Sequence, residues 1–238
     1  MRCIRTSCLA TISLAGMLGC GGDLSLPSAT GEGLSLSIVD GQGQTGTVGQ
    51  ELPEPLIVEV ESGGTPIQGQ QIAFEVSGDP AAGRLEPDTA VTDADGRALT
   101  HWVLGSVPGS HEVEAKLVVS DPAPPPTAVF EASAVAGDPD TVRAVSPVSQ
   151  PGRIGRPVPE APTVLVLDHF GNPVLGAEVA WDVTSGGGTL SSPTTAADAS
   201  GKATVIWTLG IGIGVQKLSA RVDGAHGSPV MFTATVLF

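Results

Sequence analysis

The stretch TDADGRALTHWVLG at residues 92–105 occurs a second time, with substitutions, as ADASGKATVIWTLG at residues 197–210. Trp102 and Trp207 hold the same place in the two copies, 105 positions apart. The flanking segments repeat at almost the same spacing: QIAFEV (71–76) with EVAWDV (178–183), and VFEASAV (129–135) with MFTATV (231–236). A repeat period of about 100 residues is the size of a domain, so the chain contains two copies of one domain.

Within each copy, apolar and polar residues alternate over short segments. In the segment RALTHWVL, the side chains of Ala98, Thr100, Trp102 and Leu104 would share one face and their neighbours the other. The same alternation occurs in three further segments of the first copy: residues 56–61, 71–76 and 112–117. A period of two is typical of β-strands that bury one face.

Turn-forming residues separate these segments. They include Asp95-Gly96, Pro108-Gly109, Gly171-Asn172-Pro173 and Ser200-Gly201. About seven strands per 100 residues, with a turn roughly every 8–12 residues, is the pattern of an immunoglobulin-like sandwich. We therefore predict an all-β protein of two tandem Ig-like β-sandwiches. The predicted core aromatic residues are Phe74, Trp102 and Phe130 in the first copy, and Trp181, Trp207 and Phe232 in the second.

The composition excludes several classes of protein. The 238 residues carry 25 Asp and Glu against 11 Lys and Arg, a net charge of −14, so nucleic acid is not an expected partner. A content of 41% hydrophobic and 15% charged residues is the opposite of a disordered chain. The 32 glycines and 20 prolines interrupt any long helix or coiled coil.

The first 20 residues have the pattern of an export signal and contain all three cysteines of the chain. Arg2 and Arg5 precede an apolar run of about 11 residues at positions 8–18, which is too short to span a bilayer. The run leads into Met17-Leu18-Gly19-Cys20, which resembles the signal of bacterial lipoproteins, with Met17 where leucine is usual. In that family the signal is cleaved before the cysteine, which then carries acyl chains.

The resemblance to lipoproteins implies a removed signal at residues 1–19 and lipidation at Cys20. Two other interpretations stay open: a plain secretory signal with an unmodified cysteine, and an uncleaved signal anchor. The lack of an A-x-A-like cleavage site argues against the first, and the short apolar run against the second. Gly21 stands where an aspartate would, by the resemblance, indicate retention in the inner membrane, so we expect an outer-membrane lipoprotein.

The remaining chain divides into a tether and two domains. Residues 20–33 are small and polar, and we predict a lipidated flexible tether there. The first Ig-like domain is predicted at residues 34–136 and the second at 137–238. Residues 136–140, AGDPD, form a short link stiffened by Pro139, so we expect the two domains to stack end to end.

Several of these motifs together resemble bacterial Ig-like domains of group 1, the invasin/intimin type. The second copy carries them best, in GNPVLGAEVAWDVTSGGGTL (171–190) and DASGKATVIWTLG (198–210). The first copy departs at Phe74, where the second has Trp, and at residues 77–85, SGDPAAGRL. The resemblance spans residues 37–136 and 140–238, and it implies rigid domains that serve as surface spacers or adhesin stalks.

One acidic motif has the residue types of a calcium loop. Asp93 and Asp95 alternate before Gly96, as carboxylates do in the first half of such a loop. The alternative is a tight turn in which glycine supplies the positive φ angle. The corresponding residues of the second copy, Asp198 and Ser200, lose one carboxylate and keep the turn. We therefore interpret this motif as a turn and predict no metal.

No other motif predicts catalysis or a cofactor. The four histidines lack further ligands at zinc spacing: His101, His111, His169 and His226. Gly210-Ile211-Gly212-Ile213-Gly214 is glycine-rich, but it is predicted to join two strands, so no helix follows to bind a phosphate. Asp138 and Asp140 flank Pro139 in the link and are expected to be solvated. The sequence has no G-x-S-x-G nucleophile motif.

These observations predict a non-enzymatic, lipid-anchored envelope protein that acts as a spacer or as an adhesion or protein-interaction module. Its expected partners are the membrane, through the lipid on Cys20, and a protein or cell-surface molecule, with no small-molecule substrate. The alternative is a periplasmic scaffold that binds a protein partner by strand addition at a sheet edge.

Overall fold

The computed structural model describes residues 33–78, 82–119 and 124–236, and every described element is a β-strand or a loop. The predicted signal, Cys20 and the tether up to residue 32 lie outside the described residues. The first sandwich contains β1 (Leu34–Asp40), β2 (Gln44–Thr47), β3 (Leu56–Ser62), β4 (Thr65–Pro66), β5 (Gln71–Val76), β6 (Gly83–Glu86), β7 (Thr89–Val91), β8 (Arg97–Leu104), β9 (Gly109–Leu117) and β10 (Thr127–Val135).

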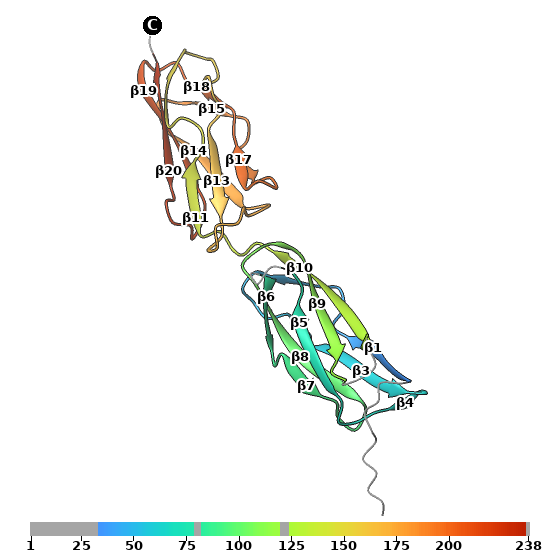
Figure 1. The fold of residues 1–238 in the computed structure, drawn as a ribbon. Helices are drawn as coiled ribbons and strands as arrows, with labels where there is room; N and C mark the ends of the chain where they lie inside the picture. Colours follow the sequence, from blue (N-terminus) through green and yellow to red (C-terminus); the bar gives the residue numbers. More distant parts are fainter. Residues whose placement is uncertain (1–32, 79–81, 120–123, 237–238) are drawn as a thin grey trace, which may run out of the picture.

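Two sheets pack face to face in the first sandwich (Figure 1). One has the order β1-β3-β8-β6, with β4 added to β3, and the other has the order β2-β10-β9-β5-β7. The faces follow the predicted alternation: in β8, Ala98, Thr100, Trp102 and Leu104 are buried and their neighbours are more exposed. Strands β2 and β10 pair in parallel, whereas the other pairs are antiparallel.

The second sandwich repeats this arrangement with one interruption. Its strands are β11 (Thr141–Ala144), β12 (Ser149–Gly152), β13 (Thr163–Leu167), β14 (Glu178–Ser185), β15 (Gly188–Leu190), β16 (Thr194–Ala196), β17 (Lys202–Thr204), β18 (Trp207–Leu209), β19 (Gly214–Arg221) and β20 (Val230–Val236). The long β8 of the first sandwich corresponds to two short strands, β17 and β18, so this sheet divides into β11-β13-β17 and β15-β18. The other sheet is continuous, in the order β12-β20-β19-β14-β16.

Each sandwich has its own hydrophobic core, and the two cores share no residue. The six aromatic residues predicted for the core are all buried: Phe74, Trp102, Phe130, Trp181, Trp207 and Phe232. The predicted fold class, two tandem Ig-like β-sandwiches, is confirmed. The described residues form ten strands in each sandwich and not about seven, because turns and breaks divide the chain into shorter pieces such as β4 and β17. The domain limits at 136 and 137 stay a prediction.

The two sandwiches follow each other end to end, joined by the link at residues 136–140 (Figure 1). The first described strand, β1, begins beside the β3–β4 turn, where Leu34 pairs with Ser62. That turn lies at the end of the first sandwich away from the link, and the last strand ends at the opposite end of the second sandwich, where Val236 pairs with Gly214. The chain therefore enters at one end of an elongated pair and leaves at the other.

Candidate functional site: the interdomain joint

The loop at residues 168–172, directly after β13, is the part of the second sandwich that meets the first. Asp168 begins it, and its Oδ1 accepts hydrogen bonds from the backbone N–H groups of Phe170 at 2.9 Å and Asn172 at 2.8 Å. Gly171 takes the positive φ of 85° that this tight turn requires. A short loop braced by its own aspartate can present Phe170 and Asn172 with little freedom.

The same carboxylate also holds the link between the domains. Its second oxygen, Oδ2, accepts from the backbone N–H of Gly137 at 3.0 Å and from the Nδ2 of Asn172 at 2.9 Å. The two carboxylate oxygens of Asp168 therefore accept four hydrogen bonds, and the residue is only 2% exposed. Burial alone raises the pKa of Asp168, but the hydrogen bonds from the Asn172 side chain and from the backbone of Gly137, Asn172 and Phe170 outweigh it and hold the pKa below its ordinary value.

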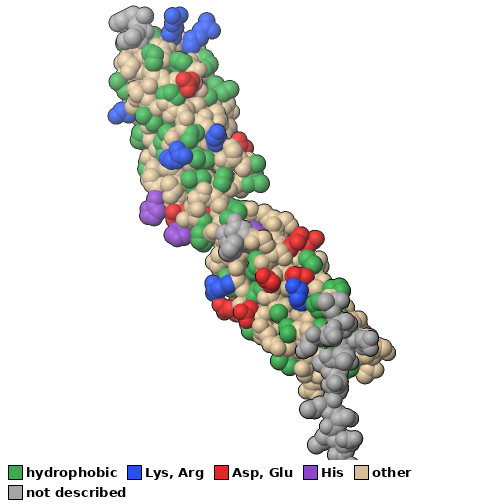
Figure 2. All heavy atoms as spheres, in the orientation of Figure 1, with side chains coloured by type: hydrophobic (Ala, Val, Ile, Leu, Met, Phe, Trp, Pro, Cys, Tyr) green, Lys and Arg blue, Asp and Glu red, His purple; other side chains and the backbone are tan. Residues whose placement is uncertain are grey.

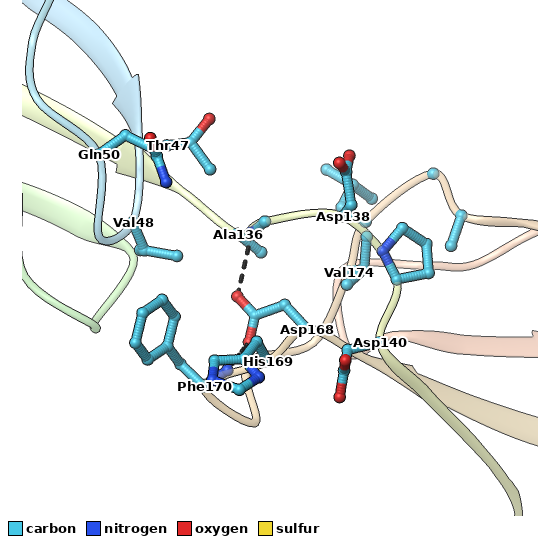
Figure 3. Close-up of a pocket in the computed structure, with 15 residues that line it drawn as sticks. Thr47, Val48, Gln50, Ala136, Asp138, Asp140, Asp168, His169, Phe170 and Val174 are labelled. Atoms are coloured by element: carbon cyan, nitrogen blue, oxygen red, sulfur yellow. Dashed lines mark hydrogen bonds between the residues drawn. The ribbon is translucent and has the colours of Figure 1, made fainter. Parts of the chain in front are cut away.

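Two side chains of this loop reach the first sandwich. The Nδ2 of Asn172 also donates to the backbone oxygen of Ser106 at 2.8 Å. Figure 3 shows the ring of Phe170 pointing from the loop toward Val48 and the strands of the first sandwich. The ring packs so closely that a Cβ added at Gly49 would lie 2.8 Å from its Cζ. One polar and one apolar contact thus join the two domains around the covalent link.

A cleft of about 850 Å³ lies at this joint, lined by both sandwiches and by the link. Its charged groups do not converge: the carboxylates of Asp138 and Asp140 point away from Asp168 (Figure 3). The Asp168 oxygens already accept four hydrogen bonds, so they are poorly placed to act as a base or to bind a ligand. Among the described residues, no three His, Cys, Asp or Glu side chains are grouped to hold a metal ion. What these contacts do is position one sandwich against the other.

The acidic motif with the residue types of a calcium loop forms a turn. Asp93 Oδ1 accepts from the backbone N–H groups of Asp95 and Arg97, both at 2.9 Å. Asp198 does the same with Ser200 and Lys202, and hydrogen bonds from Ser200 and Lys202 lower its pKa. In both copies the carboxylate closes a turn, as the interpretation from sequence predicts.

The four histidines have different contacts. His101 is exposed and its Nδ1 lies 2.8 Å from Glu51 Oε1, while the His111 Nε2 lies 2.8 Å from the backbone oxygen of Val107. His169 stands at the joint with its ring edge-on to Phe170, and His226 is exposed in the β19–β20 loop. Among the described residues, none of these rings belongs to a group of three or more His, Cys, Asp or Glu side chains that could hold a metal ion.

The predicted lipidation site, Cys20, lies outside the described residues, as does the apolar run before it. Within residues 33–78, 82–119 and 124–236 there is no helix long and apolar enough to cross a membrane. Membrane attachment through Cys20 therefore stays a prediction.

The residues that form the joint do not follow from the sequence motifs. Asp168, Phe170 and Asn172 share an Asp-x-x-Gly-x pattern with Asp93 and Asp198, and this pattern is the available signal. It predicts a braced turn, but it does not say that this particular turn meets another domain. The first copy does not have this pattern at the corresponding positions, because it has Glu61 and Gly63 in place of the aspartate and the phenylalanine.

The substitution Asp168→Asn is expected to lower the free energy of unfolding by about 1–3 kcal/mol at pH 7, because an amide cannot accept from all four donors. The carboxylate has a depressed pKa in the folded state, so its contribution is complete above about pH 4 and is lost as pH falls below the ordinary value of 3.8. Denaturant unfolding from pH 7 to pH 3 would measure this. The difference in free energy of unfolding between wild type and Asp168→Asn should become smaller at acidic pH. The variant of an exposed residue, Asp138→Asn, should unfold with the same free energy as wild type. A difference that does not change with pH would contradict the stabilising role of the ionised Asp168 carboxylate.

Comparison with known proteins places the chain as follows. Residues 160–235 match the family model described as bacterial Ig-like domain (group 1). The solved structure of FdeC, an Escherichia coli adhesin, has a TM-score of 0.54 and 16% sequence identity, over 87% of this chain and 65% of that one. This chain thus spans 65% of the length of that structure. InvD of Yersinia pseudotuberculosis has a TM-score of 0.48 and 16% identity, over 87% of this chain and 58% of that one. No curated protein sequence matches the chain.

Proposed function

We propose, from the premise that the second sandwich is a bacterial Ig-like domain of group 1, that this protein is a non-enzymatic, lipid-anchored spacer of the cell envelope that presents a binding end to a partner. The family assignment rests on residues 160–235. The FdeC structure, whose likeness here is one of fold, is that of an adhesin, which supports an adhesive role. The anchor would be the lipid on Cys20, in the outer membrane.

The observation that carries this proposal is the direction of the chain through the two sandwiches. Cys20 lies 14 positions before Leu34, where the chain enters the outer end of the first sandwich. The second sandwich extends from the link away from that end, and its last described strand, β20, ends at the far end of the pair (Figure 1). An anchor at Cys20 would therefore hold one end of the pair at the membrane and project the other end away from it.

The contacts at the joint are evidence for a spacer function, because a spacer must hold its binding end at a distance from the membrane. Asp168, Phe170 and Asn172 connect the second sandwich to the link and to the first sandwich. These contacts add to the short, proline-containing link and limit the motion of one domain against the other. A flexible linker without such contacts would let the second sandwich fold back toward the membrane.

The alternative function is a periplasmic scaffold that binds a protein by strand addition. One observation favours it: β1, Leu34–Asp40, is the first strand of its sheet and pairs with β3 on one side only. Its single charged residue is Asp40, so little charge protects this edge from pairing with another strand. A partner strand would add backbone hydrogen bonds along β1.

The two functions predict different locations, which a protease that cannot cross the outer membrane would distinguish. A cleavage site for such a protease is inserted between Gly63 and Gly64, in the exposed β3–β4 turn. If the protein is a surface spacer, the inserted site is cut in intact cells. Cutting that requires permeabilised cells would contradict surface exposure and favour the scaffold. A periplasmic marker protein carrying the same site is the control for leakage.

A further inference from the structure

Among the described residues, three adjacent loops lie at the end of the second sandwich away from the joint. They are residues 152–157, 185–188 and 210–214, here called the distal tip. The N–H of Leu209 donates to the backbone oxygen of Arg156 at 3.0 Å, which joins the first loop to the third. A Cβ added at Gly210 would lie 2.5 Å from the backbone oxygen of Gly186, so the second loop packs against the third as well.

The buried side chain of Gln216 holds the third loop in place, and the loop exposes apolar side chains. Gln216, which is buried, donates through Nε2 to the backbone oxygens of Gly212 at 2.7 Å and Gly210 at 3.2 Å, and its Oε1 accepts from Gly210 N at 2.9 Å. The side chain of Ile211 is nevertheless 88% exposed and that of Ile213 is 55% exposed. Ile154, on the adjoining loop, is 43% exposed. Three isoleucines therefore project from a braced surface.

The corresponding end of the first sandwich shows that this chemistry is particular to the distal tip. The two ends share their hydrogen bonds: Leu104 N donates to Gln50 O at 2.9 Å, as Leu209 N does to Arg156 O. At matching positions, however, the first sandwich has the polar residues Thr47, Gln50 and Ser106 where the second has Arg153, Arg156 and Ile211. In the first sandwich this end is covered by the loop at residues 168–172. The second sandwich exposes arginine and isoleucine at the same place.

The charge of the distal tip also contrasts with the rest of the molecule. Residues 34–136 contain 15 Asp and Glu with 3 Lys and Arg, whereas residues 137–238 contain 8 and 6. The three loops of the distal tip hold Arg153 and Arg156, both exposed, and no acidic residue. Figure 2 shows Lys and Arg side chains at this end and Asp and Glu side chains gathered over the first sandwich. The distal tip is thus a basic and apolar end on an acidic protein.

We propose that the distal tip inserts into the surface of an anionic lipid bilayer. Projecting isoleucines suit the interfacial region of a bilayer, where apolar side chains enter the acyl boundary and arginines contact anionic headgroups. The positive charge of these loops, on a chain that is otherwise acidic, favours an anionic surface. Head-to-tail stacking of a second copy is disfavoured, because Gly63 replaces Phe170 at the matching position of the first sandwich.

Lipid binding by the distal tip would identify a membrane as the partner in the proposed function. The biological role of this binding rests on the proposed function, whereas the binding itself does not. A protein anchored at Cys20 in one membrane and inserted through the distal tip into another would bridge two membranes. Lipid binding by the distal tip itself can be tested without the anchor, so failure of one proposal is distinguishable from failure of the other.

The test uses the chain from residue 20 onward, with Cys20→Ser so that no lipid is attached. Its sedimentation is measured with vesicles of phosphatidylcholine alone and with vesicles of phosphatidylcholine and phosphatidylglycerol in equal parts. We expect binding to the anionic vesicles that weakens as salt rises. The double variant Ile211→Ser/Ile213→Ser should weaken this binding by about tenfold or more, as should Arg153→Gln/Arg156→Gln. Leu175→Ser, an exposed apolar residue near the joint, is the matched control and should bind like the parent chain.

Three results would overturn the proposal. They are no binding of the parent chain to either vesicle, equal binding by parent and distal-tip variants, and a self-association of the parent chain that Ile211→Ser/Ile213→Ser abolishes in sedimentation. The last would assign the distal tip to a second copy of the chain. The substituted side chains are exposed, so the unfolding midpoints of the variants should match that of the parent and the comparison should not be confounded by misfolding.

Discussion

Trp207→Ala is expected to lower the free energy of unfolding of the second sandwich by about 3–5 kcal/mol, the usual cost of removing a large buried aromatic side chain. Trp207 is fully buried and belongs to the core cluster of the second sandwich. Trp102→Ala should destabilise the first sandwich by a similar amount, since Trp102 occupies the equivalent place in the other core. Because the two cores share no residue, each variant should shift one of two unfolding transitions in calorimetry.

Two controls separate the loss of packing from other effects. The Nε1 groups of Trp102 and Trp207 have no hydrogen-bond partner among the described residues, so Trp207→Phe loses volume but no hydrogen bond. It should cost about 1–2 kcal/mol, clearly less than the alanine variant. Ile206→Ala changes the exposed neighbour in sequence and should stay within about 0.5 kcal/mol of wild type. An alanine variant that loses less than about 1 kcal/mol would show that Trp207 is not central to this core.

Cys20→Ser is expected to abolish incorporation of fatty acid and to release the protein from the membrane fraction. Each buried methylene of an acyl chain contributes about 0.8 kcal/mol, so loss of several chains removes the anchor. The measurement is metabolic labelling with palmitate followed by cell fractionation. Cys3→Ser and Cys8→Ser are matched controls, because cleavage before Cys20 would remove both positions. Both should keep the label; a Cys20→Ser protein that still carries label would refute the proposed anchor.

The two copies of the domain keep the same aromatic core positions and differ at their corresponding ends. Their cores keep the aromatic pairs Phe74 and Trp181, Trp102 and Trp207, Phe130 and Phe232. Their corresponding end loops differ in charge and polarity: one end meets the loop with Phe170, and the other bears Ile211. We infer that the fold constrains the core positions, whereas the loops are free to take on separate roles.

Alternation and turn chemistry are local properties of the sequence, and they determine the fold class and most of the buried positions. A strand has a side-chain period of two, so the faces of β3, β5, β8 and β9 follow from sequence order alone. The repeat of the Asp-x-x-Gly-x pattern likewise predicts that Asp93 and Asp198 close turns, as they do. Such features depend on residues near one another in the chain.

The joint and the distal tip depend on residues that are far apart in sequence, so tertiary structure alone decides them. Asp168 caps the N–H of Gly137, 31 positions away, and Asn172 contacts Ser106, 66 positions away. Neither pairing follows from local periodicity, because a loop has no repeat that fixes where its side chains point. The same limit applies to Gly210–Gly214: its pattern predicts a loop between strands, but only its position beside Arg153 and Arg156 makes it a basic, apolar surface.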